Sequence, residues 1–196
     1  MIPSLRRSLA GATAAVLAYV LTAILAVPWL PRLLGRGGNS PRNLWPGYET
    51  AGEPAWAAIG WVLLAAHRVP LQVASPDSTF VGYLPLGTAP WLFLCGPLAC
   101  FVVGAVVVQH ADEDAAIPAA VGAYLFVGYL ISILLGAFVF RVSTGQTLIT
   151  PALWNTTSLS WMVVVPLVPL AFGTAGAYVG SEPAIKAALP TWGTPS

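Results

Sequence analysis

The stretch EPAWAAIGWVLLAAHRVP, from Glu53 to Pro70, decides the fold, because it is too apolar for water and too short to cross a bilayer with ease. Its uncharged part, Pro54 to Ala66, has thirteen residues, which make about 20 Å of helix, whereas the hydrocarbon layer is about 30 Å thick. The stretch also lacks the polar face that an interfacial helix needs. We therefore interpret it as a short span or as a half-helix packed inside a bundle of helices.

The composition of the whole chain indicates a membrane protein. Of its 196 residues, 57% are hydrophobic and 8% are charged, against roughly 25% charged in soluble domains. Four longer uncharged runs are apolar on every face, which favours helices over barrel strands, whose residues alternate in polarity. The prediction is an all-α polytopic bundle, with four long transmembrane helices and one short hydrophobic helix, at about 8–30, 54–68, 90–108, 116–140 and 159–179. Residues 1–180 then form a single transmembrane domain, and residues 181–196 form a polar tail.

The segments between these helices are rich in Gly, Pro, Asn and Ser, and we expect them to be irregular loops. One loop, Val73–Gly87, carries Phe80 and Tyr83, which suggests that it lies on the headgroup layer or on a partner. Another, Val142–Ser158, contains a glycosylation sequon at Asn155. The sequon lies so close to the next predicted helix that the membrane disfavours its modification.

Small residues recur in the predicted helices and indicate where helix backbones approach one another. The candidates for helix packing are Gly60, Gly128, Gly136, Gly173, Gly176 and Gly180. Packing within one chain explains them more simply than a dedicated dimer face does.

The predicted helix cores contain no Asp, Glu, Lys or Arg, the residues on which proton relays, voltage sensors and ion-coupled carriers usually depend. The remaining functional candidates are His67, Arg68 and His110. Each histidine stands at a predicted helix end beside charged residues, where we expect a solvated or capping group. Two imidazoles without a carboxylate or thiolate cluster do not make a structural metal site, and no nucleophile–base motif is present. We therefore expect no cofactor, no metal and no catalysis.

Basic residues do not orient a bundle of five spans. Four of them would lie on each side, with Arg6, Arg7, Arg68 and Arg141 facing Arg32, Arg36, Arg42 and Lys186 across the membrane. The first helix often dominates orientation. The arginine pair directly before it therefore favours an amino terminus in the cytoplasm.

These observations favour a non-enzymatic, multi-pass protein of the cell membrane that serves as an accessory or structural subunit of a larger membrane assembly. Its expected partners are the lipid bilayer and either other membrane subunits or further copies of the chain. A formal charge of +1 gives no basic surface for nucleic acid. The alternative is a small passive channel or transporter component built around the short helix at 54–68, because half-helices line substrate cavities in such proteins.

Three short motifs carry a resemblance to a known family. They are Gly60-Trp61 followed by Ala66-His67, Val127-Gly128-Tyr129, and the prolines and spaced glycines of VPLVPLAFGTAGAYVG at Val165–Gly180. Over about Gly52–Gly180 the chain resembles an uncharacterised family of small multi-span membrane proteins from halophilic archaea. The resemblance implies a polytopic fold and supplies no activity.

Overall fold

Four helical segments in the structure, a computed structural model, are long and apolar enough to cross a membrane. The structure describes residues 3–30, 55–84, 86, 89–109, 118–144, 147–153 and 160–182. Within these ranges the four candidate spans are Leu9–Trp29, Pro90–Gln109, Pro118–Val139 and Trp161–Ser181. Each has 20 to 22 residues, which matches the thickness of the hydrocarbon layer. The described residues therefore contain four helices that are, by length and composition, able to span a membrane, as the sequence predicts.

Proline and glycine divide these spans into shorter helical elements. The elements are α1 (Pro3–Ala26) with a 3-10 turn (Val27–Trp29), a 3-10 turn (Pro90–Leu94) before α4 (Cys95–Gln109), α5 (Pro118–Val139), and α6 (Trp161–Val168), a π-helical turn (Pro169–Gly173) and α7 (Thr174–Ser181). In the last span, Pro166 and Pro169 have no N–H to donate. Such sites are where helices kink or take up an extra residue per turn, and the π-helical turn follows directly.

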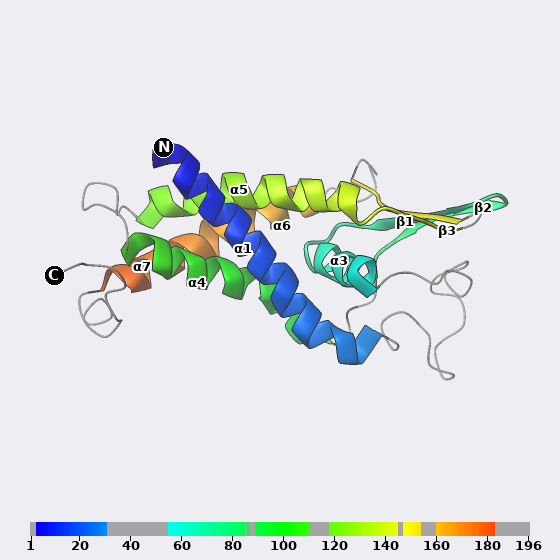
Figure 1. The fold of residues 1–196 in the computed structure, drawn as a ribbon, viewed down its shortest axis with the longest axis horizontal. Coiled ribbons are helices and arrows are strands. Elements are labelled where there is room, and N and C mark those ends of the chain that lie inside the picture. Colours follow the sequence, from blue (N-terminus) through cyan, green and yellow to red (C-terminus); the bar gives the residue numbers. More distant parts are fainter. Residues whose placement is uncertain are drawn as a thin grey trace.

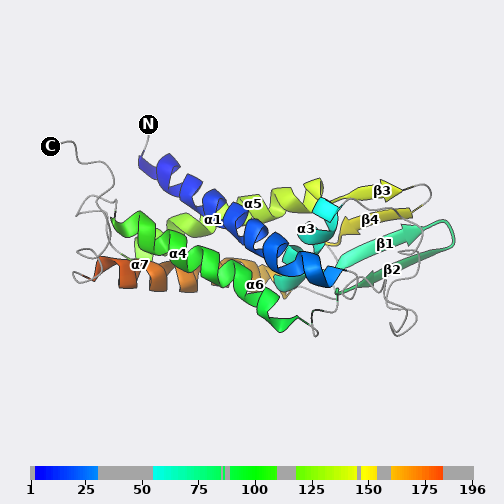
Figure 2. The same cartoon turned by 60° about the horizontal axis from the view of Figure 1, so that its bottom comes forward.

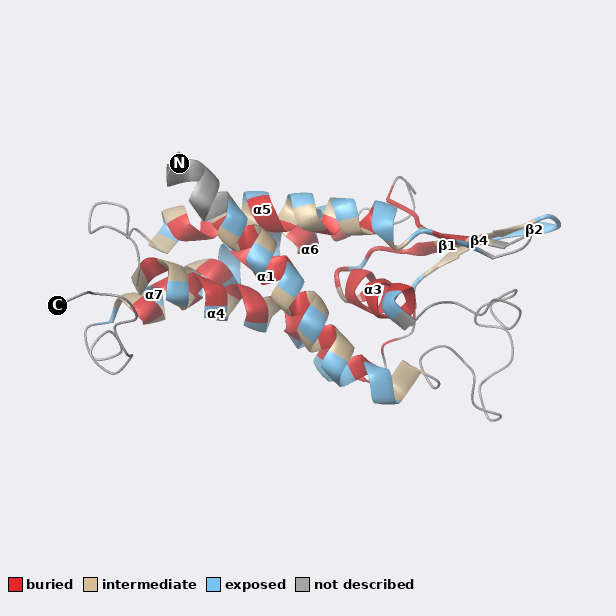
Figure 3. Cartoon of the chain, viewed as in Figure 1, coloured by how far each residue is buried: buried red, intermediate tan, exposed pale blue. Residues whose placement is uncertain are grey.

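The four spans lie side by side, with α1 crossing obliquely over α4 and α5 (Figures 1 and 2). α1 packs on α4 and α5, and α4 packs on α7. Successive spans run in opposite directions, so α1 begins and α7 ends at the same end of the bundle, which we call the terminal end (Figure 2). Buried residues face the inside of the bundle and exposed ones alternate with them on its outside (Figure 3).

A four-stranded antiparallel sheet extends from the opposite end of the bundle, which we call the sheet end (Figure 1). Its strands are β1 (Leu71–Ser75), β2 (Ser78–Gly82), β3 (Val142–Thr144) and β4 (Thr147–Pro151), in the order β2-β1-β4-β3. The all-α prediction is wrong in this respect, because both hairpins lie in segments that were expected to be irregular loops.

The pairing of the two hairpins explains why these strands are difficult to recognise in the sequence. β1 alternates in burial, with Leu71 and Val73 buried, but Pro76 and Asp77 follow at once and form the turn to β2. At the centre of the sheet β1 pairs with β4, and Val73 lies opposite Ile149. This pairing joins residues far apart in the chain, so the local sequence shows the turn residues and not the partner.

The short helix α3 (Ala55–Ala66) packs between the sheet and the bundle (Figure 1). Every residue from Ala57 to Ala65 is buried. Most of them belong to a core cluster shared with both inner strands, the end of α1 and the start of α4, while Leu63 and Leu64 belong to the core of the bundle. A helix that is apolar on every side is one that is covered on every side. The sequence left two interpretations of this stretch, a short span and a half-helix packed inside the bundle. The burial of α3 fits the second, a helix packed inside the protein.

Phe140, directly after α5, fastens α3 to the bundle. Its carbonyl accepts a hydrogen bond from Trp61 Nε1 at 2.7 Å, and its ring fills a notch over Gly60, where a Cβ atom would overlap the ring. The same ring stacks on Tyr19 of α1 with centroids 5.5 Å apart. One aromatic side chain thus joins α1, α3 and the end of α5.

Candidate functional site

The carboxyl end of α3 places the one histidine that the structure describes. The helix ends with hydrogen bonds from Val69 N–H to Leu64 O and from Arg68 N–H to Ala65 O, both 3.0 Å. This is the Schellman arrangement, in which the residue corresponding to Arg68 has a positive φ and is usually glycine. Arg68 has φ 60° and points its exposed side chain away, while His67 turns into the protein.

His67 is 2% exposed and uses both ring nitrogens. Nδ1 lies 2.8 Å from Leu63 O and Nε2 lies 2.7 Å from the Tyr129 hydroxyl. A carbonyl can only accept, so in the neutral imidazole Nδ1 carries the proton and Tyr129 donates to Nε2. Burial lowers the pKa of the imidazole from its ordinary value, and the bond to Leu63 opposes this less strongly. The pair is thus a neutral, satisfied link between α3 and α5.

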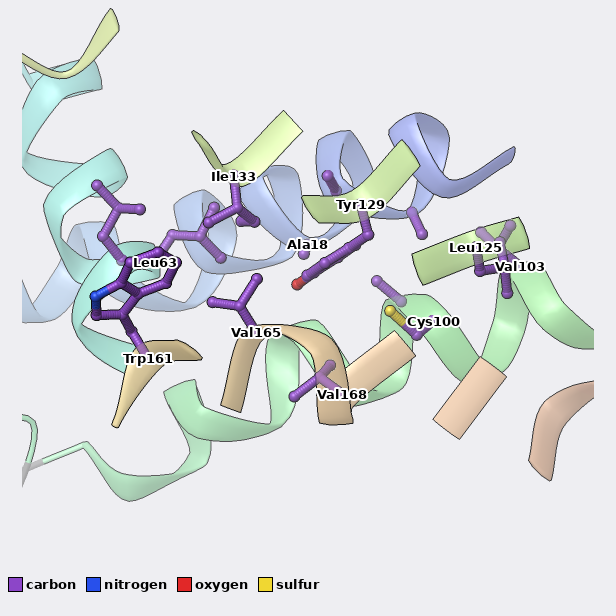
Figure 4. Close-up of a cluster of buried hydrophobic side chains, with 14 of the residues drawn as sticks. Ala18, Leu63, Cys100, Val103, Leu125, Tyr129, Ile133, Trp161, Val165 and Val168 are labelled. Atoms are coloured by element: carbon purple, nitrogen blue, oxygen red, sulfur yellow. The ribbon is translucent and has the colours of Figure 1, made fainter. Parts of the chain in front are cut away.

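The surroundings of this pair come from the bundle core. Tyr129 reaches from α5 into a cluster that includes Ala18 of α1, Cys100 of α4 and Val165 of α6 (Figure 4). Gly96 of α4 leaves the space for the pair, because a Cβ atom there would lie 2.8 Å from the Tyr129 hydroxyl and 3.0 Å from His67 Nε2. The pair therefore joins α3 to α5 and is surrounded by residues of α1, α4 and α6.

The chemistry available at this site is limited. Cys95 and Cys100 are buried free thiols. Among the described residues, no three His, Cys, Asp or Glu side chains come close enough together to hold a metal ion. With both ring nitrogens of His67 bonded inside the protein, the imidazole has no free lone pair or proton to offer. The geometry suits it to positioning α3 rather than to acid–base chemistry.

The predicted functional candidates therefore have different outcomes. His67, which was expected to be solvated or capping, is buried, because it packs into the bundle against Gly96 of α4 and Tyr129 of α5 instead of ending at a membrane surface. Arg68 is exposed and forms the helix end. His110 and Asn155 lie outside the described residues, as does the predicted polar tail.

Most of the glycines proposed for helix packing lie where helix backbones meet. A Cβ atom at Gly176 would overlap the backbone of Phe101, and one at Gly180 would lie 2.5 Å from Ala105 O, so α7 rests directly on α4. Gly128 lies against Gly11 where α5 crosses α1, and Gly173 lies against Leu125 of α5. Gly60 and Gly136 instead lie against a side chain, since a Cβ atom at Gly136 would lie 3.1 Å from the ring of Phe140. All of these contacts are made within one chain.

Sequence reasoning missed Tyr129 and Gly96 as members of the site. Tyr129 stands 62 residues from His67, and nothing in its local sequence distinguishes it from other apolar helix positions. One signal did exist, because Gly60-Trp61, Ala66-His67 and Val127-Gly128-Tyr129 are motifs of the family resemblance. The fold brings His67 and Tyr129 of these motifs together.

These features define a mostly helical protein with four candidate membrane spans and a small antiparallel sheet at one end. It belongs to a family of unknown function (DUF7978), whose model matches residues 1–182. No curated protein and no solved structure matches it. The membership agrees with the resemblance to an uncharacterised family and adds no activity to it.

Proposed function

We propose that the protein is a non-enzymatic accessory or structural subunit of a larger membrane assembly. The observation that carries the proposal is the division of the chain into a closed helical bundle and a projecting sheet. The bundle anchors the protein, and the sheet presents a surface to a partner. In this proposal the membrane is the cell membrane and the family is one of halophilic archaea, as the resemblance suggests.

The closed interior of the bundle argues against a conduction path. Helix backbones meet directly at Gly176 and Gly128. The buried hydrophilic side chains in the described part of the chain are Thr22 and His67, and each is hydrogen-bonded within the protein. Solute pathways instead need polar or charged groups along a water-filled route. The channel alternative was built around the short helix as the lining of a solute cavity, whereas α3 is packed between the bundle and the sheet with Ala57 to Ala65 buried.

The sheet provides the surface for a partner. Its outer strands are β2 and β3, and β3 begins beyond the end of the candidate span Pro118–Val139, so in this proposal the sheet lies outside the hydrocarbon layer. Among the described residues, β2 exposes Ser78, Thr79 and Phe80 in succession. Exposed strand edges bind a further strand through main-chain hydrogen bonds, with side chains such as Phe80 providing selectivity. The edge of β2 is therefore the proposed site of assembly.

Purification from native membranes in a mild detergent, followed by mass spectrometry of the bound proteins, tests this proposal. We expect a fixed set of partners with the wild-type chain and its loss with Phe80→Ala. Phe138→Ala is the matched control, because Phe138 is 71% exposed on a spanning helix and should leave the complex intact. Copies of the chain alone at the β2 edge would make the assembly a homo-oligomer.

Two results would contradict the proposal. One is a wild-type protein that purifies without any companion and permits solute flux in vesicles, which would favour the channel component. The other is a complex that survives Phe80→Ala and is lost in Phe138→Ala, which would move the contact from the sheet to the bundle.

A further inference from the structure

An apolar cavity of about 170 Å³ lies on the side of the bundle between α1, α3 and α5. Leu63 and Leu64 of α3 line it, as do Ile133 of α5 and Phe140 after it. Val16 of α1 also lines the cavity and is 62% exposed, so this side chain stands at the outside of the bundle. The cavity therefore lies beside the lipid that surrounds the spans.

The polar atoms at the cavity are already bonded within the protein. The Tyr19 hydroxyl donates to Trp56 O at 2.9 Å, and Ser132 Oγ donates to Gly128 O at 2.8 Å. A water molecule in the cavity would find few partners. An engineered apolar cavity of about 150 Å³ in another protein stays dry and binds benzene. The occupant that fits this cavity is accordingly a hydrocarbon group.

The depth of the cavity indicates which part of a lipid it meets. Trp29 and Trp91 form an edge-to-face pair with centroids 5.2 Å apart, and tryptophan is typical of the membrane–water interface. Tyr19 precedes Trp29 by ten helical residues, about 15 Å at about 1.5 Å per residue, and because α1 runs obliquely the depth below Trp29 is smaller. On α5 the cavity is lined by Ser132, Ile133 and Gly136 and by Phe140, which directly follows the span Pro118–Val139 at the sheet end. The cavity therefore lies between the sheet-end interface and the bilayer centre, at the depth of the middle methylene groups of a lipid chain.

We propose that this cavity is a binding site for the middle part of one lipid hydrocarbon chain. The exposed side of α1 at Val16 admits the chain, and the ring of Phe140, held by Gly60 and Tyr19, forms its rigid wall. The site is independent of the proposed role as a subunit, because it lies in the bundle and uses no residue of the sheet.

Photolabelling in vesicles tests the proposal. The protein is reconstituted into phosphatidylcholine vesicles that contain a small fraction of phosphatidylcholine with a diazirine near the middle of one chain. After irradiation, mass spectrometry locates the label. We expect the peptide of α1 that contains Ala15, Val16 and Tyr19 to be labelled, and Ser132→Leu, which fills the cavity from α5, to reduce this labelling at least threefold.

Two control variants separate the site from ordinary lipid contact. Ser132→Ala removes the same hydroxyl without filling the cavity, and Ile131→Phe adds bulk at a 51% exposed position of α5; both should leave the labelling of α1 unchanged. If Ser132→Leu does not fold, Ala15→Leu fills the cavity from α1 and the label is read on α5 instead.

Equal labelling of α1 in all of these variants would overturn the proposal, because the lipid would then touch only the outer surface. Wild-type protein with no label at the cavity, or with α1 crosslinked to another protein, would also overturn it. A crosslink from α1 to another protein would mean that a side chain of a neighbouring helix, and not a lipid, occupies the cavity.

Discussion

At the scale of single residues, the hydrogen bond from Tyr129 to His67 joins α5 to the end of α3. Tyr129→Phe removes the hydroxyl and leaves Nε2 buried without a partner, which costs about 1–3 kcal/mol. We expect a lower midpoint of thermal unfolding in detergent. Tyr178→Phe is the control, because Tyr178 is 63% exposed and should unfold at the wild-type temperature. Equal midpoints for the two variants would show that the buried bond adds no stability.

The same imidazole makes stability depend on pH. Because burial lowers the pKa of His67 in the folded protein, the unfolded chain binds a proton at a higher pH, near 6.5. Stability is therefore present above that pH and is lost as the pH falls below it, by up to about 1.4 kcal/mol per unit. The neighbouring titratable groups, Tyr129, Cys95 and Cys100, are neutral in this range.

Thermal unfolding between pH 7.5 and pH 5.5 measures this dependence. We expect His67→Gln to flatten the fall in the unfolding midpoint and His110→Gln to leave it as in the wild type. Only the slopes are compared, since His67→Gln also changes the midpoint itself. An unchanged slope in His67→Gln would assign the pH dependence to other groups.

At the scale of elements, the end of α3 shows the cost of a side chain in a glycine conformation. Arg68 has φ 60°, a conformation in which a Cβ atom is disfavoured by about 1–2 kcal/mol. Within the described residues, its exposed side chain makes no hydrogen bond or ion pair that would offset this cost. Arg68→Gly should therefore raise the unfolding midpoint. Arg68→Ala is the control, because it removes the charge and keeps the Cβ atom. A lower midpoint for the glycine variant would mean that the guanidinium has a role of its own.

The contact between α4 and α7 depends on the absence of a side chain. Gly176→Leu places atoms on the backbone of Phe101, which cannot move aside as a flexible side chain can, and overpacking of this kind costs about 1–3 kcal/mol or more. We expect early unfolding and a broadened size-exclusion peak in detergent. Ala175→Leu also introduces a leucine, at an exposed neighbouring position, and should behave as the wild type. Normal behaviour of Gly176→Leu would show that α4 and α7 do not depend on this close backbone contact.

How far the sequence predicts these elements depends on the range of the interactions that form them. The four spans follow from length and apolar composition alone. α3 is ambiguous, since an apolar helix of twelve residues has the same pattern whether lipid or a sheet covers it. The strands are missed because Pro76 and Asp77 suggest a loop, while the β1–β4 pairing is set by the fold. His67 is recognised as a candidate, but its partner Tyr129 is known only once α3 has been placed.

At the scale of the whole molecule, the reassignment of α3 changes how the chain is threaded through the membrane. With four spans instead of five, every segment that connects to the sheet lies on one side. Arg32, Arg36, Arg42, Arg68 and Arg141 then share the sheet end by connectivity, and Arg6, Arg7 and Lys186 share the terminal end. Four spans therefore place five of the eight basic residues on the side of the sheet end and three on the side of the terminal end, whereas five spans would place four on each side.

Basic residues near the ends of spans favour the cytoplasmic side, and acidic residues count for little. We therefore predict that the sheet faces the cytoplasm and that the start of α1 faces outward, the reverse of what Arg6 and Arg7 alone suggest. Asp77→Cys in the β1–β2 turn and Glu182→Cys after α7 test this, because both positions are exposed and the described native cysteines are buried. In intact cells a membrane-impermeant maleimide should label Glu182→Cys and should reach Asp77→Cys only after lysis. The opposite pattern would place the sheet, and any partner that binds β2, outside the cell.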